Sequence, residues 1–213
     1  IDAQANLISK WMSVGFIHGV MNTDNCSIVG DTIDYGPCAF MDKYNENTVF
    51  SSIDTFGRYS YKNQPLICQW NLAQLANCIL PFLSDEKEKS IKIAQNEIDK
   101  YSEVYHNYFS NEIFKKLGFS CKIEDDNKLK DELFDIMKRD ELDFTISFSN
   151  LYFELLNIDN ELSEFTRKSR DFTKWISKWK LRLKKEKKSV TQIAENLKQS
   201  NPIIIPRNHL VEE

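Results

Sequence analysis

Three oxygen-bearing side chains, those of Asp24, Asn25 and Asp34, have the types and the spacing that could do chemistry in this sequence. They lie in the stretch HGVMNTDNCSIVGDTIDYGP, residues 18–37, which has almost no helical periodicity. Hard divalent cations such as Mg²⁺ bind carboxylate and amide oxygens, with phosphate and water completing the coordination shell. Asn, Asp and Gly also gather in surface turns, because they hydrogen-bond the local backbone. The pattern alone leaves both interpretations open.

The spacing fits the metal corner of kinase-like sites, where an Asn ends an H-R-D-x-x-x-x-N motif and an Asp opens D-F-G. His18 and Asn25 occupy the His and Asn positions, and the Asp-Tyr-Gly at 34–36 occupies the second motif. Val20 stands where a kinase has its catalytic base. Valine cannot accept a proton, so phosphoryl transfer to a hydroxyl by that route is excluded. Asp24 is the nearby carboxylate that could take over.

Three blocks of this sequence closely resemble the selenoprotein O family, known in bacteria as YdiU. The blocks are HGVMNTDN, TIDYGP and GRYSYKNQP, and they occur in the family's order and at its spacing. The similarity covers about residues 1–83 and continues more weakly through the rest of the chain. The late segment NPIIIPRN, residues 201–208, is similar to the family's N-P-x-x-x-x-R-N segment.

The resemblance implies a pseudokinase-like enzyme that transfers AMP, rather than phosphate, from ATP to Ser, Thr or Tyr hydroxyls of other proteins. It also implies Mg²⁺ or Mn²⁺, and UTP as the nucleotide in some members. Carried over by motif, Asp24 would be the proton acceptor, and Asn25 and Asp34 would be metal ligands, with Asp34 also against the nucleotide. The metal would neutralise phosphate charge while the hydroxyl attacks the α-phosphorus.

The sequence departs from the family in what surrounds these blocks. Only one predicted helix precedes the first block, whereas family members carry an N-terminal lobe with basic residues that grip the nucleotide. The family's C-terminal tail with its redox-active Cys or selenocysteine is also missing. We therefore expect a fragment that keeps the metal corner and transfers AMP poorly or not at all alone. The alternative is a non-catalytic remnant that acts as a binding or scaffold module.

The expected fold is mainly α, a protein-kinase-like C-lobe with a short strand pair at the metal-binding loop. Residues 1–83 would form its catalytic part and residues 84–213 a helical remainder. Apolar spacing predicts a helix over 3–17, and β-branched pieces predict two very short strands within residues 26–36. Residues 42–62 are expected to be irregular, and a helix should run from an N-cap at Asn63, with Pro65 in its first turn, to near Pro81. Further helices are expected at about 85–116, 126–139, 142–157, 161–183 and 189–199, with an exposed turn at 184–188.

The composition is that of a globular protein, with 213 residues, 41% of them hydrophobic, and a net charge of -4. This charge gives no reason to expect nucleic acid as a partner. No apolar run approaches the roughly 18 to 20 residues of a bilayer span, and no signal peptide is visible. The expected compartment is the cytoplasm, or the mitochondrion if the source is eukaryotic. Five cysteines without a C-x-x-C pair are expected to be buried thiols rather than disulfides or a zinc site.

The basic segment, residues 167–188, carries 11 of the 28 basic residues against two acidic ones. Its apolar residues share one helical face, which favours a stripe facing the core with a solvated back. A basic amphipathic helix that binds a membrane surface, a nucleic acid or a protein is the alternative. Of the remaining polar residues, His18 is expected to anchor its loop rather than act as a base. Arg58 is expected to form a structural ion pair, with orientation of a metal-loop carboxylate as the alternative.

Overall fold

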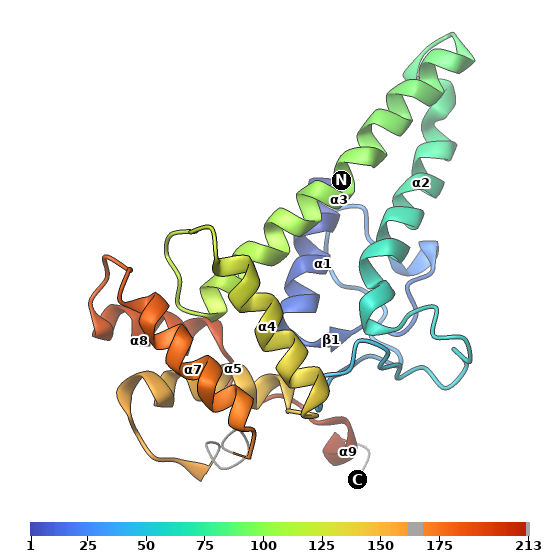
Figure 1. Ribbon diagram of the computed structural model, residues 1–213. Helices are drawn as coiled ribbons and strands as arrows, with labels where there is room; N and C mark the ends of the chain where they lie inside the picture. The colour runs from blue at the N-terminus through green and yellow to red at the C-terminus, as the bar shows by residue number, and fades with distance from the viewer. Residues whose placement is uncertain (162–167, 212–213) are drawn as a thin grey trace. The chain divides into compact units, whose positions relative to one another are not determined.

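The computed structural model describes residues 1–161 and 168–211, and it is mainly helical, as predicted. Figure 1 shows the elements in chain order. They are α1 (Asp2–Val14), β1 (Phe16–Ile17), the 3-10 helix η1 (Thr23–Asn25), β2 (Ala39–Phe40), the 3-10 helix η2 (Tyr61–Asn63), α2 (Gln64–Leu83), α3 (Lys87–Lys116), α4 (Asp126–Arg139), α5 (Phe144–Leu156), α7 (Arg170–Leu183), α8 (Val190–Ser200) and α9 (Asn208–Val211).

The chain divides into two compact units. The first comprises Ile1–Ala39 and Asn47–Phe109, and the second comprises Phe40–Glu46 and Ser110–Glu213. The long helix α3 begins in the first unit and ends in the second. Each unit is described separately below.

The helix α1 forms where the sequence predicts one, because apolar residues recur at helical spacing. Ala5, Ile8 and Met12 are buried along one face. The helix ends at Gly15, whose φ of 72° lies in the left-handed region that glycine adopts without steric cost. The chain then enters β1 directly, so the start of the site-bearing loop is fixed by a helix end and a strand.

The prediction of two short strands within residues 26–36 is wrong, because these residues form a short turn at 28–30 followed by irregular backbone. Positive φ angles at Gly30 and Asp34, of 83° and 55°, interrupt any extended run. The two strands lie at either side instead, since β1 pairs with β2 in a two-stranded sheet. A short strand pair therefore does flank the loop of residues 18–38, but it is made of other residues than those expected.

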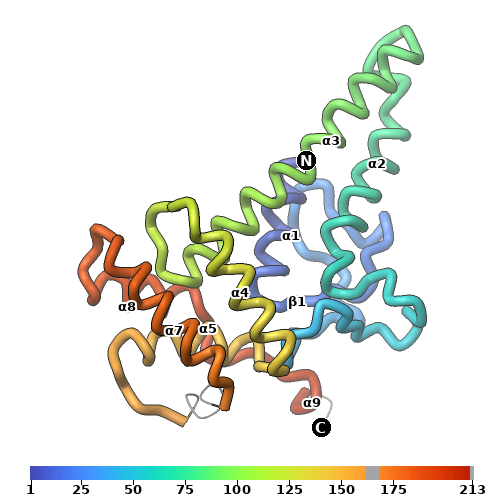
Figure 2. The backbone as a smooth tube through the Cα atoms, in the orientation of Figure 1, coloured from blue at the N-terminus to red at the C-terminus, as the bar shows by residue number. Residues whose placement is uncertain are grey.

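The helix α2 begins as predicted, with Asn63 at the N-cap and a proline in its first turn, but it continues through Pro81 to Leu83. Figure 2 shows α2 and the first part of α3 side by side, and the Gln69 side-chain amide donates a hydrogen bond to the Ile98 carbonyl oxygen at 3.3 Å. The buried residues of α2 are Gln64, Cys68 and Asn71. This buried face is polar, so most apolar side chains of α2 lie elsewhere on the helix.

One helical stretch of the described residues, Tyr61–Leu83, is long and apolar enough to cross a membrane by length and composition. The sequence prediction that no apolar run approaches this length is wrong by that criterion. A single stretch of this kind is a weak indication of a span, because the core helix of a soluble protein passes the same test.

The second unit is built around buried aromatic side chains. Phe144 and Phe148 of α5 pack with ring centroids 5.2 Å apart. Trp175 and Trp179 of α7 are fully buried, and their indole N–H groups donate to the carbonyl oxygens of residues 129 and 117 at 2.8 Å. Buried indole groups need such partners, because an unpaired donor in an apolar core is costly.

The apolar stripe of the basic segment faces the core, as predicted. All five residues of the predicted face are buried, namely Phe172, Trp175, Ile176, Trp179 and Leu183. The helix begins at Arg170, behind an N-cap in which the Ser169 hydroxyl accepts from the Phe172 N–H at 2.9 Å. Residues 162–167, where the helix was expected to start, lie outside the described residues.

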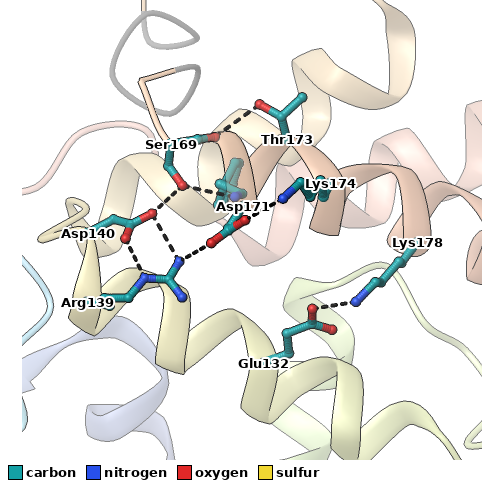
Figure 3. Close-up of polar contacts among 9 residues, drawn as sticks. Glu132, Arg139, Asp140, Ser169, Asp171, Thr173, Lys174 and Lys178 are labelled. Atoms are coloured by element: carbon teal, nitrogen blue, oxygen red, sulfur yellow. Dashed lines mark hydrogen bonds and ion pairs between the residues drawn. The ribbon is translucent and has the colours of Figure 1, made fainter.

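Figure 3 shows how charges on the polar side of α7 are paired. Lys174 and Arg139 both contact the Asp171 carboxylate, at 2.9 and 2.8 Å, and Lys178 contacts Glu132 of α4 at 2.5 Å. Exposed pairs of this kind each contribute about 1 kcal/mol or less. Part of the positive charge of the basic segment is therefore neutralised within the fold, and its binding of a partner stays untested.

A buried ion network joins the end of α7 to the start of α4. The Arg182 guanidinium donates to the Asp126 carboxylate, to Glu186 at 2.7 Å and to the Cys121 carbonyl oxygen at 2.6 Å. Burial alone would lower the pKa of Arg182, but its hydrogen bonds to Asp126 and Glu186 raise it. The residues 184–188 form the predicted turn, and Glu186 in that turn completes the network.

The late segment that resembles the family, residues 201–208, also contributes an ion network to the second unit. Arg207 donates to both Asp42 and Asp143. The other carboxylate oxygen of Asp143 accepts from the Ile146 N–H at 2.8 Å and so caps α5. Arg207 therefore has a structural role in this fold.

Lys116, the last residue of α3, is buried with only 4% of its surface exposed. Its ammonium group lies 4.6 Å from the Phe148 ring centroid and 3.5 Å from the Ser200 carbonyl oxygen. Burial lowers the pKa of Lys116 to about 7, against a smaller opposing effect of the Glu112 charge. The folded protein therefore binds a proton at this site less tightly than the unfolded chain does.

We predict that Asp126→Ala destabilises the protein by about 3–5 kcal/mol, because it leaves the Arg182 charge buried without its main partner. The measurement is the free energy of unfolding in urea. Asp125→Ala is the matched control, since the neighbouring Asp125 side chain is 73% exposed and pairs with the exposed Lys128 at 3.2 Å. Equal losses in the two variants would contradict a net role for the buried network.

We predict that stability rises with pH between about 7 and 9 through Lys116, by at most about 1.4 kcal/mol for each pH unit. In this range the unfolded chain, with an ordinary lysine pKa of about 10.4, binds more protons than the folded protein. Lys116→Met should remove this slope, whereas Lys115→Met, at a side chain that is 61% exposed, should keep it. Urea unfolding of all three proteins at several pH values isolates the contribution of Lys116, and parallel curves of stability against pH would refute the prediction.

Candidate functional site

The loop between the strands carries Asn25 at the end of η1. The Asn25 side-chain amide nitrogen donates to the Val20 carbonyl oxygen at 2.9 Å, and the Asn25 backbone N–H donates to the Asn22 carbonyl oxygen at 3.0 Å. These bonds fix the plane of the amide. Its oxygen, Oδ1, makes no hydrogen bond within the described part of the chain and is available to bind a cation.

Asp34 holds a backbone conformation that is unusual for a residue with a side chain. Its φ of 55° lies in the left-handed region, and its carbonyl oxygen accepts from the Gly36 N–H at 2.8 Å in a tight turn. Such conformations cost free energy and are concentrated at functional sites. The Asp34 carboxylate is exposed and has neither a hydrogen bond nor an ion pair among residues 1–161 and 168–211.

His18 is fully buried and links the two arms of the loop. Its Nε2 lies 2.8 Å from the Ile33 carbonyl oxygen, and its Nδ1 accepts from the Val20 N–H at 3.4 Å. A carbonyl oxygen can only accept, so Nε2 carries the proton. The ring also stacks on Trp11 at a centroid distance of 5.2 Å. Because both ring nitrogens are engaged, His18 anchors the loop, as the sequence suggested, rather than acting as a base.

The backbone of Gly19 lies against the second arm of the loop. Gly19 has a φ of 85°, and a Cβ atom there would lie 2.9 Å from the Pro37 carbonyl oxygen. A Cβ atom at Gly36 would lie 3.9 Å from a Val20 methyl group. Residues 18–20 and 33–37 are therefore neighbours. The Asn25 side chain is hydrogen-bonded to Val20. The two segments that carry the predicted metal ligands are therefore both held against residues 18–20.

The predicted metal site itself stays a prediction. The described residues contain no group of three or more His, Cys, Asp and Glu side chains that could hold a metal ion. Magnesium sites that use one or two protein ligands with substrate phosphates do not need such a group. The donors here, an amide oxygen and a carboxylate, are the hard oxygen ligands that Mg²⁺ and Mn²⁺ prefer.

Asp24, the predicted proton acceptor, is exposed and has no hydrogen bond or ion pair in the described segments. Tyr59, which lies outside this loop in the sequence, holds it by a hydrogen bond: the Tyr59 hydroxyl donates to the Asn22 side-chain oxygen. Asp24 also affects its neighbour Cys26, whose thiol pKa is raised mainly by burial and further by the Asp24 charge. An exposed carboxylate on a fixed turn can accept a proton from an incoming hydroxyl group.

All five cysteines are free thiols, in agreement with the prediction of no disulfides. The expectation that they are buried is right for Cys68 and wrong for Cys78 and Cys121, which are exposed. Cys26 and Cys38 are half-buried, and burial raises the pKa of both. Thiols with raised pKa values are poor nucleophiles, so the two cysteines near the loop have the character of packing residues.

Sequence reasoning missed the residues of α2 that position this loop. The Gln64 side chain is buried, accepts from the His18 N–H at 3.0 Å and donates to the Phe16 carbonyl oxygen at 2.9 Å. The Asn71 side chain donates to the Met21 carbonyl oxygen at 3.0 Å. Polar residues in a helix usually indicate a solvated face. The one available signal was that Gln64 lies inside the GRYSYKNQP block.

Comparison with known proteins identifies the family. A family model described as "Protein adenylyltransferase SelO" matches residues 1–213. A relative named "Protein nucleotidyltransferase YdiU" from Clostridium beijerinckii is 50% identical over 213 residues, which cover 100% of this chain and 42% of the relative. A relative of the same name from Bacillus thuringiensis is 49% identical, with 100% and 43% of the two chains covered.

The chain therefore belongs to a family of nucleotidyltransferases. Specifically, it is a member of the SelO family, as the three sequence blocks indicated. It spans less than half the length of these curated relatives.

We predict that Gln64→Ala loosens the candidate site. Leaving the His18 N–H and the Phe16 carbonyl oxygen unpaired in a buried place should cost about 1–3 kcal/mol and speed hydrogen exchange in residues 18–25. Asn77→Ala, on an exposed position of the same helix, is the control. The measurement is hydrogen exchange by mass spectrometry together with urea unfolding. The prediction fails if the two variants protect residues 18–25 equally well.

Proposed function

We propose that this chain carries the metal-binding and proton-accepting part of a protein adenylyltransferase, which transfers AMP from ATP to Ser, Thr or Tyr hydroxyls of proteins. The alternative nucleotide that the resemblance implies is UTP. The observation that supports the proposal most is the common anchoring of Asn25 and Asp34 on the His18–Val20 segment, with an oxygen of each side chain free of partners in the described residues.

The proposed fold is the C-lobe of a kinase-like protein, with residues 1–83 as its catalytic part and 84–213 as its helical remainder. Its support is the order of the sequence motifs together with the mainly helical architecture. We place the protein in the cytoplasm, on the basis of its bacterial relatives.

Asn25 Oδ1 and the Asp34 carboxylate would hold Mg²⁺ or Mn²⁺, which supplies neutralisation of phosphate charge when bound. The other steps belong to groups of this chain and its substrates. Asp24 accepts the proton of the attacking hydroxyl, whose oxygen forms a bond to the α-phosphorus of the nucleotide. The bond between that phosphorus and the β-phosphate oxygen breaks, and pyrophosphate leaves with the electron pair. The products are the AMP ester of the protein and pyrophosphate.

The absence of a carboxylate at position 20 fits this assignment. The Val20 carbonyl oxygen holds Asn25, and its side chain lies near Gly36, so the residue has a packing role. Asp24 is the carboxylate adjacent to the proposed metal ligand. A general base at that position needs only to reach the substrate hydroxyl, because the charge of the leaving group is neutralised elsewhere.

The curated relatives are more than twice as long as this chain. We propose that residues outside the 213 supply the contacts to the nucleotide phosphates. For this reason, AMP transfer by the 213-residue chain alone should be weak or absent. Robust self-AMPylation of that chain with labelled ATP and Mg²⁺ would refute this part of the proposal.

We predict that two substitutions separate binding from chemistry in the complete gene product. Asp34→Ala should abolish Mg²⁺-dependent ATP binding, because it removes a metal ligand. Asp24→Asn should keep ATP binding and lower AMP transfer by about 10²–10⁴-fold, because it removes only the proton acceptor. Calorimetry reports binding, and labelled ATP reports transfer.

Asp31→Ala is the control, since Asp31 is an exposed acid of the same loop with no assigned role. It should behave like the unsubstituted protein in both assays. Metal-dependent ATP binding that survives Asp34→Ala would overturn the assignment of the metal site, and full activity of Asp24→Asn would overturn that of the proton acceptor.

A further inference from the structure

A cleft of about 700 Å³ opens beside the candidate site, within the first unit. Val20 and Asn22 of the site loop form one wall. The opposite walls come from the turn of residues 53–59 and from the start of α2, including Leu66. Asn22 precedes the proposed proton acceptor by two residues, so a group bound in the cleft lies close to the place where a hydroxyl must react.

Hydrogen bonds hold the turn of residues 53–59 in one shape. Both carboxylate oxygens of Asp54 are used, accepting from the backbone N–H groups of Arg58 and Tyr59 at 2.8 Å. The Asn63 side chain donates to the Gly57 carbonyl oxygen at 2.8 Å. The Tyr59 hydroxyl bonds to Asn22. These contacts tie the turn both to α2 and to the site loop, so its shape is fixed before any ligand arrives.

This fixed turn presents large apolar side chains to solvent. Phe56 is 99% exposed and Ile53 is 81% exposed, and Leu66 across the cleft is 64% exposed. An almost fully exposed phenylalanine side chain buries no apolar surface, so Phe56 does not stabilise the fold. Contiguous exposed apolar groups next to a reactive site are typical of a surface that binds another molecule.

Arg58 adds a positive charge to the same cleft. Its guanidinium stacks on the rings of Trp70, at 4.9 Å, and Tyr59, at 5.6 Å. It has no ion pair within the described parts of the chain, and the nearby Asp54 is occupied by backbone N–H groups. Neither expectation from the sequence, a structural ion pair or a bond to the metal loop, is met. Stacking holds the group in place and leaves its N–H edge free to bind a carboxylate in a bidentate way.

We propose that this cleft binds the protein substrate, and that it selects a segment with a carboxylate and a large apolar side chain near the hydroxyl to be modified. The carboxylate contacts Arg58, and the apolar side chain packs on Phe56, Ile53 and Leu66. This inference rests on the proposed function, because only a transfer reaction requires a hydroxyl-bearing segment there. Charge complementarity decides the chemistry of the occupant, since the cleft offers one unpaired cation and no unpaired carboxylate from its turn.

The test uses the complete gene product and two fluorescein-labelled peptides. Each short peptide has one serine and one phenylalanine, and they differ only in carrying glutamate or lysine beside the serine. Fluorescence anisotropy measures peptide binding without any chemistry, and labelled ATP measures transfer to the serine. We expect the glutamate peptide to bind at least about tenfold more tightly than the lysine peptide. A hydrogen bond to a charged group contributes enough binding free energy for a difference of that size.

The variants assign this preference to residues. Arg58→Gln should weaken binding of the glutamate peptide about tenfold, and Arg58→Glu should reverse the preference toward the lysine peptide. Phe56→Ser should weaken both peptides. Lys62→Gln is the control, because Lys62 is an exposed cation of η2 outside the cleft. Mg²⁺-dependent ATP binding should stay unchanged in every variant.

The outcomes are distinguishable from a failure of the proposed function. If peptides bind with the expected dependence on Arg58 and no AMP is transferred, the cleft is supported and the adenylyltransferase assignment fails. If AMP is transferred but Arg58→Glu keeps the glutamate preference, the cleft proposal is overturned. A Phe56→Cys variant of the complete protein that takes up no more maleimide than the unsubstituted protein would also overturn it, because another part of the chain would then cover the cleft.

Discussion

The buried hydrogen bonds of His18 are the constraint on which the rest of the site depends. The ring reaches Ile33 in one arm of the loop and Val20 in the other, and the backbone N–H reaches Gln64 of α2. His18 and Gln64 are fully buried, so breaking any one of these bonds leaves a buried polar atom of His18 unpaired. The exposed acids of the loop therefore have fixed positions although they have no stabilising contacts of their own.

Two arginines of the second unit are paired with carboxylates, whereas three charged side chains near the candidate site are unpaired within the described residues. Arg182 and Arg207 of the second unit each contact two carboxylates, which stabilises the folded state. In the part of the first unit near the loop, Asp24, Asp34 and Arg58 have no ion pair among the described residues. Their isolation on rigid turns agrees with a site that completes its contacts only with substrate.

Local patterns in the sequence predicted the helices well and the site's supports poorly. The apolar stripe of α7 follows helical spacing, so its burial could be read directly. The strands, of two residues each, are too short to show a period, and Pro81 lies too near the helix end to stop it. Gln64 and Asn71 act on residues 46 and 50 positions away in the chain. No local pattern reports such contacts, whereas the candidate site acids were predicted from the family motifs, and their roles stay predictions.

The valine at position 20 connects the fold to the proposed chemistry. In a kinase motif that position supplies the base, but here its backbone carbonyl oxygen holds Asn25 and its side chain faces the turn after Asp34. The position thus serves the packing of the two arms, and on the proposed function the acceptor role falls to Asp24, four residues later on an exposed 3-10 turn. The proposed base then lies directly beside the proposed metal ligand Asn25, rather than five residues before it as in the kinase motif.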